Sequence, residues 1–214
     1  MSKEMKRTWI ITTIVCLLPV IAGIILYDKL PDKIVTHWDG NGNPNDWSPK
    51  LAGAIIFPAS LMLLNMLFPF LLEADPRKKN IPDKLKNLAQ WIIPLAEVFA
   101  STVTLAEGMN RKVNVPLYGK LFFGLLVVIV GNYMPKATQN YTIGFKLPWT
   151  LEDEDNWNKT HRLAGYVWVV GGMLIIVTTF LGNGSVNMWI ILLLLVLIPL
   201  FYSLCIYLKK QRTQ

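Results

Sequence analysis

One stretch of this chain constrains its fold more than any other feature. Residues 163–208 form a run of 46 amino acids without a charged side chain. As one continuous α-helix, this run would be about 69 Å long, whereas the hydrocarbon core of a bilayer is about 30 Å thick. The run therefore predicts two membrane-spanning helices, over residues 163–181 and 186–207. A tight turn at residues 182–185, with the sequence Gly-Asn-Gly-Ser, would join them.

Four further apolar runs predict four more spans, over residues 9–27, 51–72, 88–109 and 117–133. Charged residues make up 16% of the chain, against about 25% in soluble domains. This composition excludes a soluble enzyme, a disordered chain and a secreted disulfide scaffold. The fold class is therefore an all-α integral membrane helical bundle with about six transmembrane helices. The third and fourth predicted spans contain charged residues, Glu97 and Lys120.

The distribution of basic residues predicts the orientation of the bundle. If the N-terminus is inside, 15 of the 21 Lys and Arg residues fall on the inner side, as the positive-inside rule requires. We therefore expect a multi-pass plasma-membrane protein with both termini in the cytoplasm. The first span resembles a signal-peptide core, but no small-x-small cleavage site follows it, so we expect an uncleaved helix. Because the basic residues flank apolar runs, the net charge of +7 does not indicate direct nucleic-acid binding.

The loop at residues 31–50 is predicted to lie outside and to be rich in turns. Trp38 and Trp47 suit the membrane interface. Asp39, Asn41 and Asn43 match the first ligands of a calcium loop, but proline and lysine occupy the positions that need glycine and glutamate. We therefore expect no calcium site. Two interpretations remain, a compact loop held at the membrane surface by its tryptophans and a loop that contacts a ligand.

The loop between the fourth and fifth spans is predicted to lie inside. Thr150 precedes four acidic residues, which suggests that Thr150 caps a helix over residues 151–161. This helix would lie along the membrane surface, with Trp157 facing lipid or protein. His161 suits either a structural hydrogen bond or, less readily, a catalytic base. His37 and His161 would lie on opposite sides of the membrane and have no zinc-site spacing, so we expect no metal, no cofactor and no enzyme activity.

Glu97 lies in the middle of the third predicted span. A carboxylate at this depth is costly unless it is paired or protonated. We therefore expect Glu97 to face the interior of the bundle. Its candidate partners are Asn65 and a backbone carbonyl group freed by Pro94.

The two polar loops together resemble those of the SdpI family of bacterial membrane proteins. The first loop is similar to the N-terminal domain of unknown function in that family, through Pro31, His37, Trp38, Gly42, Asp46, Trp47 and Lys50. The second loop resembles the C-terminal signature, through Gly131, Asn132, Pro135, Lys136, Asn140, Gly144, Pro148, Trp149, Thr150, Trp157, Thr160, His161, Arg162 and Gly165. The family often has arginine and threonine where this chain has Lys146 and Leu147, and lysine lacks the planar fork of arginine.

The resemblance implies a function that the residues alone do not. Members of the family act as immunity proteins that protect a bacterium against its own secreted antimicrobial peptide. They can also act as receptors that hold a transcriptional repressor at the membrane. The resemblance suggests an N-terminal domain over residues 1–87 and a C-terminal domain over residues 88–214. The alternative is a small transporter or exporter, suggested by Glu97 and by the prolines within the spans.

The residues predicted to contact the lipid bilayer, a peptide toxin or a cytoplasmic repressor protein come from both loops. They are His37, Trp38, Asp46, Trp47, Asn132, Pro135, Asn140, Lys146, Pro148, Trp149, Thr150, Trp157, His161 and Arg162. Glu97 and Asn65 are added as polar residues within the membrane.

Overall fold

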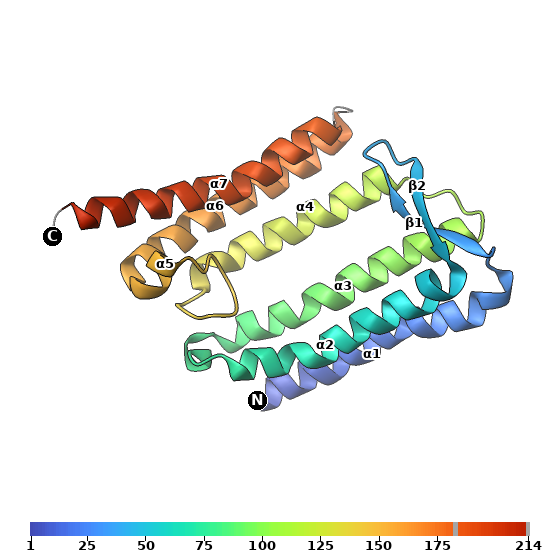
Figure 1. The fold of residues 1–214 in the computed structure, drawn as a ribbon, viewed down its shortest axis with the longest axis horizontal. Coiled ribbons are helices and arrows are strands. Elements are labelled where there is room, and N and C mark those ends of the chain that lie inside the picture. Colours follow the sequence, from blue (N-terminus) through green and yellow to red (C-terminus); the bar gives the residue numbers. More distant parts are fainter. Residues whose placement is uncertain (182–183, 213–214) are drawn as a thin grey trace. The chain divides into compact units, whose positions relative to one another are not determined.

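The computed structural model describes residues 1–181 and 184–212, and it is almost entirely helical (Figure 1). Six helices in this part of the chain are long and apolar enough to cross a membrane, which confirms the predicted number of spans. They cover Lys3–Lys29, Ala52–Ala74, Asp83–Gly108, Val115–Lys136, Glu154–Phe180 and Met188–Gln211. The third and fourth spans, which carry charged residues, are among them.

The chain folds into two compact units. Unit 1 contains Met1–Glu73 and Lys86–Pro116, and unit 2 contains Ala74–Leu85 and the chain from Leu117 onward. The division into domains at residue 87 remains a prediction, because these units describe packing alone.

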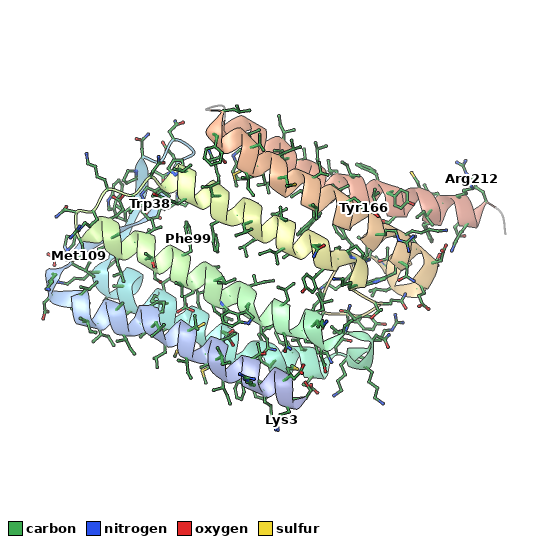
Figure 2. All side chains as sticks on the ribbon, turned by 180° about the vertical axis from the view of Figure 1, so that it is seen from behind. Lys3, Trp38, Phe99, Met109, Tyr166 and Arg212 are labelled. Atoms are coloured by element: carbon green, nitrogen blue, oxygen red, sulfur yellow. The ribbon has the colours of Figure 1, made fainter. Side chains whose placement is uncertain are left out.

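Unit 1 is built from three helices, α1 (Lys3–Leu26), α2 (Phe57–Ala74) and α3 (Asp83–Gly108). At one end, the N-terminal ammonium group of Met1 lies 3.1 Å from the carboxylate of Glu73. At the other end, Gly108 of α3 packs against Leu30 and Ile34, which follow α1. Figure 2 shows Lys3 at the first of these ends and Trp38 and Met109 at the second.

The segment between α1 and α2, which we expected to be an irregular loop, forms an antiparallel hairpin. Strand β1 (Lys33–Trp38) pairs with β2 (Pro44–Pro49), and the register is irregular around His37. The hydroxyl oxygens of Thr36 and Ser48 lie 3.1 Å apart across the two strands. Ile34 is buried at the base of the hairpin with Leu30, Ala54 and Leu105. The hairpin is therefore anchored in the core of unit 1.

Unit 2 is built from α4 (Val115–Tyr133), the short helix α5 (Pro148–Glu152), α6 (Glu154–Phe180) and α7 (Gly184–Gln211). Two 3₁₀ turns, Lys78–Asn80 and Met134–Lys136, complete it. Helices α4 and α6 approach closely at Gly124 and Gly172, where a Cβ on Gly172 would lie 2.7 Å from the carbonyl oxygen of Gly124. Small residues of this kind allow transmembrane helices to pack backbone against backbone.

The structure corrects the predicted surface helix. Helix α6 runs without interruption from Glu154 to Phe180, so residues 151–161 do not form a separate helix. Its N-cap is Asp153, whose side chain accepts a hydrogen bond from the amide of Asn156 at 3.1 Å. Thr150 instead lies inside α5, so its prediction as an N-cap was wrong. The predicted turn at residues 182–185 includes residues 182–183, which lie outside the described part of the chain.

Candidate functional site in the polar loop

The most densely hydrogen-bonded part of unit 2 is the segment at residues 134–162, which we call the polar loop. Asn140 organises its first half and is completely buried. Its amide group donates to the carbonyl oxygens of Thr138 and Ile143 at 2.7 and 3.0 Å. Its carbonyl oxygen accepts from the amides of Thr142 and Ile143 at 2.8 and 2.6 Å. Asn140 therefore satisfies all its polar atoms within the loop and shapes it from inside.

A second organiser is Asp75, which sequence reasoning missed. One carboxylate oxygen of Asp75 accepts from the amide of Tyr141 at 2.9 Å and from the hydroxyl of Thr142 at 2.6 Å. The guanidinium group of Arg77 donates to the carbonyl oxygen of Leu151 at 3.1 Å and lies over the Tyr141 ring. Asp75 and Arg77 therefore tie the segment before α3 to the polar loop. These contacts span more than 60 residues, so no local pattern could indicate them.

Thr150 closes the second half of the loop. Its buried hydroxyl accepts from the amide of Leu147 at 3.0 Å and donates to the carbonyl oxygen of Phe145 at 2.8 Å. The side chain of Gln139 donates to the carbonyl oxygens of Thr150 and Leu151, both at 2.8 Å. The threonine therefore fixes the backbone before α5, a different role from the one predicted.

His161 joins the loop to α6 and is 1% exposed. Its Nε2 atom accepts from the amide of Phe145 at 3.0 Å, and its Nδ1 atom lies 2.8 Å from the carbonyl oxygen of Trp157. Since an amide can only donate and a carbonyl can only accept, these partners assign the proton to Nδ1 of a neutral ring. Gly144 has φ of 119°, and a Cβ there would collide with the imidazole. His161 is thus a buried structural group.

Trp157 and Asn156 connect the start of α6 to its neighbours. The Trp157 ring is fully buried, stacks on His161 with ring centroids 4.0 Å apart, and donates to the carbonyl oxygen of Ala137 at 2.6 Å. Trp157 therefore does not face lipid. The buried amide of Asn156 donates to the carbonyl oxygen of Ser203 at 3.0 Å and accepts from Thr160 at 3.0 Å.

Helix α7 contacts the polar loop through its last turns. The Trp149 indole donates to the hydroxyl of Ser203 at 3.1 Å and stacks on Tyr207. The ammonium group of Lys210 lies 2.6 Å from the carboxylate of Asp153. Burial acts to raise the pKa of Asp153, but the hydrogen bonds from Lys210 and from the amide of Asn156 lower it below its usual value. The loop and the end of α7 thus form one assembly.

The predicted site residues of unit 2 therefore divide into two sets. The buried set shapes the loop and is composed of Asn140, Thr150, Trp157 and His161. The remaining residues lie at the surface, with Trp149 half-buried and Asn132, Pro135, Lys146, Pro148 and Arg162 exposed. The surface set, which includes two cationic side chains, is the part that a partner can reach.

The predicted site residues of unit 1 gather on the hairpin. His37, Asp46 and Trp47 are exposed, and Trp38 is half-buried. The Nδ1 atom of His37 lies within hydrogen-bond distance of Asn45, and Asp46 accepts from the amide of Trp47 at 2.8 Å. The structure thus brings these four side chains onto one small element.

The turn of the hairpin explains its likeness to a calcium loop. The carboxylate of Asp39 accepts hydrogen bonds from the amides of Asn41 and Asn43 at 2.8 and 2.9 Å. The hydrogen bonds from Asn43 and Asn41 hold the pKa of Asp39 below its usual value. Gly42 supplies the positive φ of 88° that the turn requires. The acidic and amide side chains thus build the turn, and the described residues contain no group of three or more His, Cys, Asp or Glu residues arranged to hold a metal ion.

A cavity of about 470 Å³ lies beneath the hairpin in unit 1. Its lining combines aromatic, small and hydroxyl side chains from both strands of the hairpin, from residues 52–60 and from α3: Thr36, Trp38, Ser48, Ala52, Gly53, Ile56, Phe57, Ser60, Ala100, Ser101 and Thr104. A mixed lining of this kind suits a ligand-binding site.

The two predicted intramembrane residues are buried in unit 1. Glu97 is completely buried, which confirms that it faces the interior. The amide of Asn65 donates to the hydroxyls of Thr12 and Thr13 at 3.3 and 3.4 Å, whereas both carboxyl oxygens of Glu97 lack a hydrogen-bond partner among the described residues, so Asn65 as its candidate partner was wrong. The thiol of Cys16 on α1 lies beside the carboxyl group.

Comparisons with known proteins found family matches in both units. The profile of the SdpI/YfhL protein family matches residues 136–205, and that of a domain of unknown function, DUF1648, matches residues 14–62. The "Immunity protein SdpI" of Bacillus subtilis (strain 168) is 33% identical over 207 residues, which cover 96% of this chain and 98% of the relative. No solved structure matches the chain significantly. With a relative this similar over almost its whole length, this multi-pass membrane protein belongs to the SdpI/YfhL family.

Proposed function

We propose that this chain is a membrane immunity protein that protects its cell against a secreted antimicrobial peptide. One observation carries the proposal, namely the full-length similarity to a protein named for immunity. The architecture supports it, because six spans place the chain in the membrane on which such a peptide acts. The exposed hairpin offers His37, Asp46 and Trp47 for contact with the peptide.

The proposed orientation puts the hairpin outside and both termini in the cytoplasm. The basic-residue count supports this direction. The hairpin and the N-terminus also lie at opposite ends of unit 1. Cysteine at exposed Asn41 should react with an impermeant thiol reagent in intact cells, and cysteine at exposed Asn158 should react only after permeabilisation. Reaction of both from the same side would contradict the orientation.

The polar loop is proposed to act as the surface that receives a cytoplasmic repressor protein. The buried side chains give the loop a fixed shape, and the exposed Lys146 and Arg162 give it positive charge. The same loop also carries the acidic residues 152–155, so it presents both signs of charge, and Lys146 and Arg162 would pair with acidic side chains of a soluble partner. The bundle itself would act without enzymatic chemistry.

The test is expression in a peptide-sensitive strain that carries a repressor-controlled reporter. Wild type should confer resistance and, when peptide is added, reporter output. Lys146→Ala and Arg162→Ala should keep resistance and lose reporter output, whereas the exposed Arg212→Ala serves as the matched control. Immunity would be contradicted if wild type conferred no resistance to any of the antimicrobial peptides encoded in the genome of its source organism. Resistance that disappears when the proton gradient is collapsed would favour the exporter alternative.

A further inference from the structure

One face of α3 carries a line of polar side chains through unit 1. Asn87, Gln90, Glu97, Ser101 and Thr104 are separated by three, seven, four and three residues, which places them on one side of a helix. Gln90, Glu97, Ser101 and Thr104 are buried, with exposed fractions from 0 to 7%. Polar side chains inside a membrane protein are costly, and they usually mark a functional site.

The atoms on this face lack partners within the described part of the protein. Seven buried side-chain atoms there have no hydrogen-bond partner, and every one belongs to unit 1. They are Trp9 Nε1, Asn65 Oδ1, Asn87 Oδ1, Gln90 Oε1, Ser101 Oγ and both carboxyl oxygens of Glu97. In unit 2, by contrast, the buried Asn140, Thr150, Asn156 and His161 are all hydrogen-bonded.

Water is the partner that such atoms ordinarily acquire. Buried polar groups in proteins are almost always satisfied, and ordered waters serve where protein groups do not reach. The unpaired atoms belong to six residues on α1, α2 and α3. Together they offer the polar partners that buried waters need. The contrast with the fully paired polar loop shows that the open capacity is particular to unit 1.

The cavity beneath the hairpin meets this polar face from outside. Ser101 and Thr104 belong both to the face and to the lining of the cavity. Glu97 lies four residues before Ser101, about one helical turn or 5.4 Å along the axis. One water that is hydrogen-bonded on both sides spans such a distance, at about 2.7–2.8 Å for each bond. The cavity lies at the end of unit 1 marked by Trp38, whereas Phe99, close to Glu97 in sequence, lies midway along α3 (Figure 2).

Within the described residues of unit 1, the groups that act on Glu97 include no cation. From α1, the thiol of Cys16 lies beside it. Helix α2 has one titratable residue, Glu73, which lies at its far end and pairs with the N-terminus. On α3 the other charged residues lie in the first turn, at Asp83, Lys84 and Lys86, and in the last turn, at Glu107. An unpaired buried carboxylate is costly, so the natural ligand of this group is a proton.

We propose that unit 1 contains a water-filled protonation site, in which Glu97 exchanges a proton with the hairpin side of the membrane through the cavity. The cavity acts as the vestibule. The hydroxyls of Thr104 and Ser101 hydrogen-bond the waters that lead from the cavity to the carboxyl group. The ligand class is water and the protons that it carries. The proposal is independent of immunity, since it concerns access to one acid and not the identity of a toxin.

The first test is infrared spectroscopy of the protein reconstituted in lipid. Wild type should show the C=O stretch of a protonated carboxyl group that disappears in Glu97→Gln, and this band should shift when H₂O is replaced by D₂O. Ala100→Leu, which fills the vestibule, should slow that shift at least about tenfold, since a blocked path adds to the barrier. Val98→Leu, on the same helix but outside the cavity lining, is the matched control.

The second test measures access from one side and does not depend on the folding of a Glu97 variant. With Cys16→Ala and Cys205→Ser as background, so that no native thiol remains, Ser101→Cys should react in intact cells with a small, charged, membrane-impermeant thiol reagent. The control Leu63→Cys, at an exposed apolar position of α2, should not react because a thiol in lipid does not ionise. A wild-type carboxyl band that is absent or does not shift in D₂O would overturn the proposal. So would a Ser101→Cys that is no more reactive than Leu63→Cys.

Discussion

The Nε2 atom of His161 accepts a hydrogen bond from the backbone amide of Phe145 at 3.0 Å. This bond joins the middle of the polar loop to the first turns of α6, across 16 residues of sequence. Its geometry uses the imidazole as an acceptor on one side and a donor on the other. The histidine that the sequence presents as a possible catalytic group is therefore held in one tautomer by the backbone.

Replacement of this histidine should destabilise the polar loop. His161→Phe keeps an aromatic ring against Trp157 but leaves the amide of Phe145 without its acceptor. The expected loss in the free energy of unfolding is about 1–3 kcal/mol, the cost of one buried donor left unpaired. Denaturant unfolding in micelles measures it. The exposed His37→Phe is the control and should change stability little.

Gly144 should tolerate no side chain. Its φ of 119° is strained for any other residue, and a Cβ would enter the space of the His161 ring. Gly144→Ala should therefore cost more than the 1–3 kcal/mol of backbone strain alone, roughly 3 kcal/mol or more. Gly119→Ala on α4 is the matched control, because a Cβ there meets nothing within 4 Å. Equal stability of the two variants would show that the loop accommodates the methyl group.

The sequence was sufficient for the spans but not for the loop. Apolar runs identified all six helices because each is long enough to dominate any local signal. Thr150 and Asp153 both precede acidic residues, and composition alone could not decide which one caps α6. The partners of the loop, such as Asp75 and Ser203, lie 47 or more residues away. The sequence identified Glu97 as an acid within the membrane, but the lack of hydrogen-bond partners along α3 required the packed structure.

Asp75 should contribute as much to the loop as the residues within it. Asp75→Ala removes the acceptor for the amide of Tyr141 and for the hydroxyl of Thr142. The expected loss is about 1–3 kcal/mol for the two lost hydrogen bonds to the carboxylate, together with faster proteolysis within residues 138–147. Glu152→Ala, an exposed acid of α5, is the control. If both variants are cut at the wild-type rate, the Asp75 contacts do not hold the loop.

The turn of the hairpin should loosen at acid pH. The amides of Asn43 and Asn41 favour the ionised form of Asp39, so its pKa is lower in the folded hairpin than in an unfolded chain. Its stabilising contribution is therefore present above the unfolded pKa and is lost as the pH falls through the folded pKa. Hydrogen-exchange protection of the Asn41 and Asn43 amides should decrease in that window. In Asp39→Asn the window should vanish, and an unchanged acid transition there would assign it to another group.

The N-cap of α6 is Asp153 in the structure, whereas the sequence suggested Thr150. The carboxylate of Asp153 accepts from the amide of Asn156 and pairs with Lys210, whereas Thr150 bonds within its own loop. Asp153→Ala should cost about 1 kcal/mol, the usual value of a lost cap, and Asp153→Asn should recover most of it because an amide oxygen also caps. Thr150→Val should cost more, about 1–3 kcal/mol, because the buried amide of Leu147 loses its acceptor. Thermal unfolding of the three variants measures the order. A cost for Asp153→Asn as large as that for Asp153→Ala would mean that the charge pair with Lys210, and not the cap, holds the start of the helix.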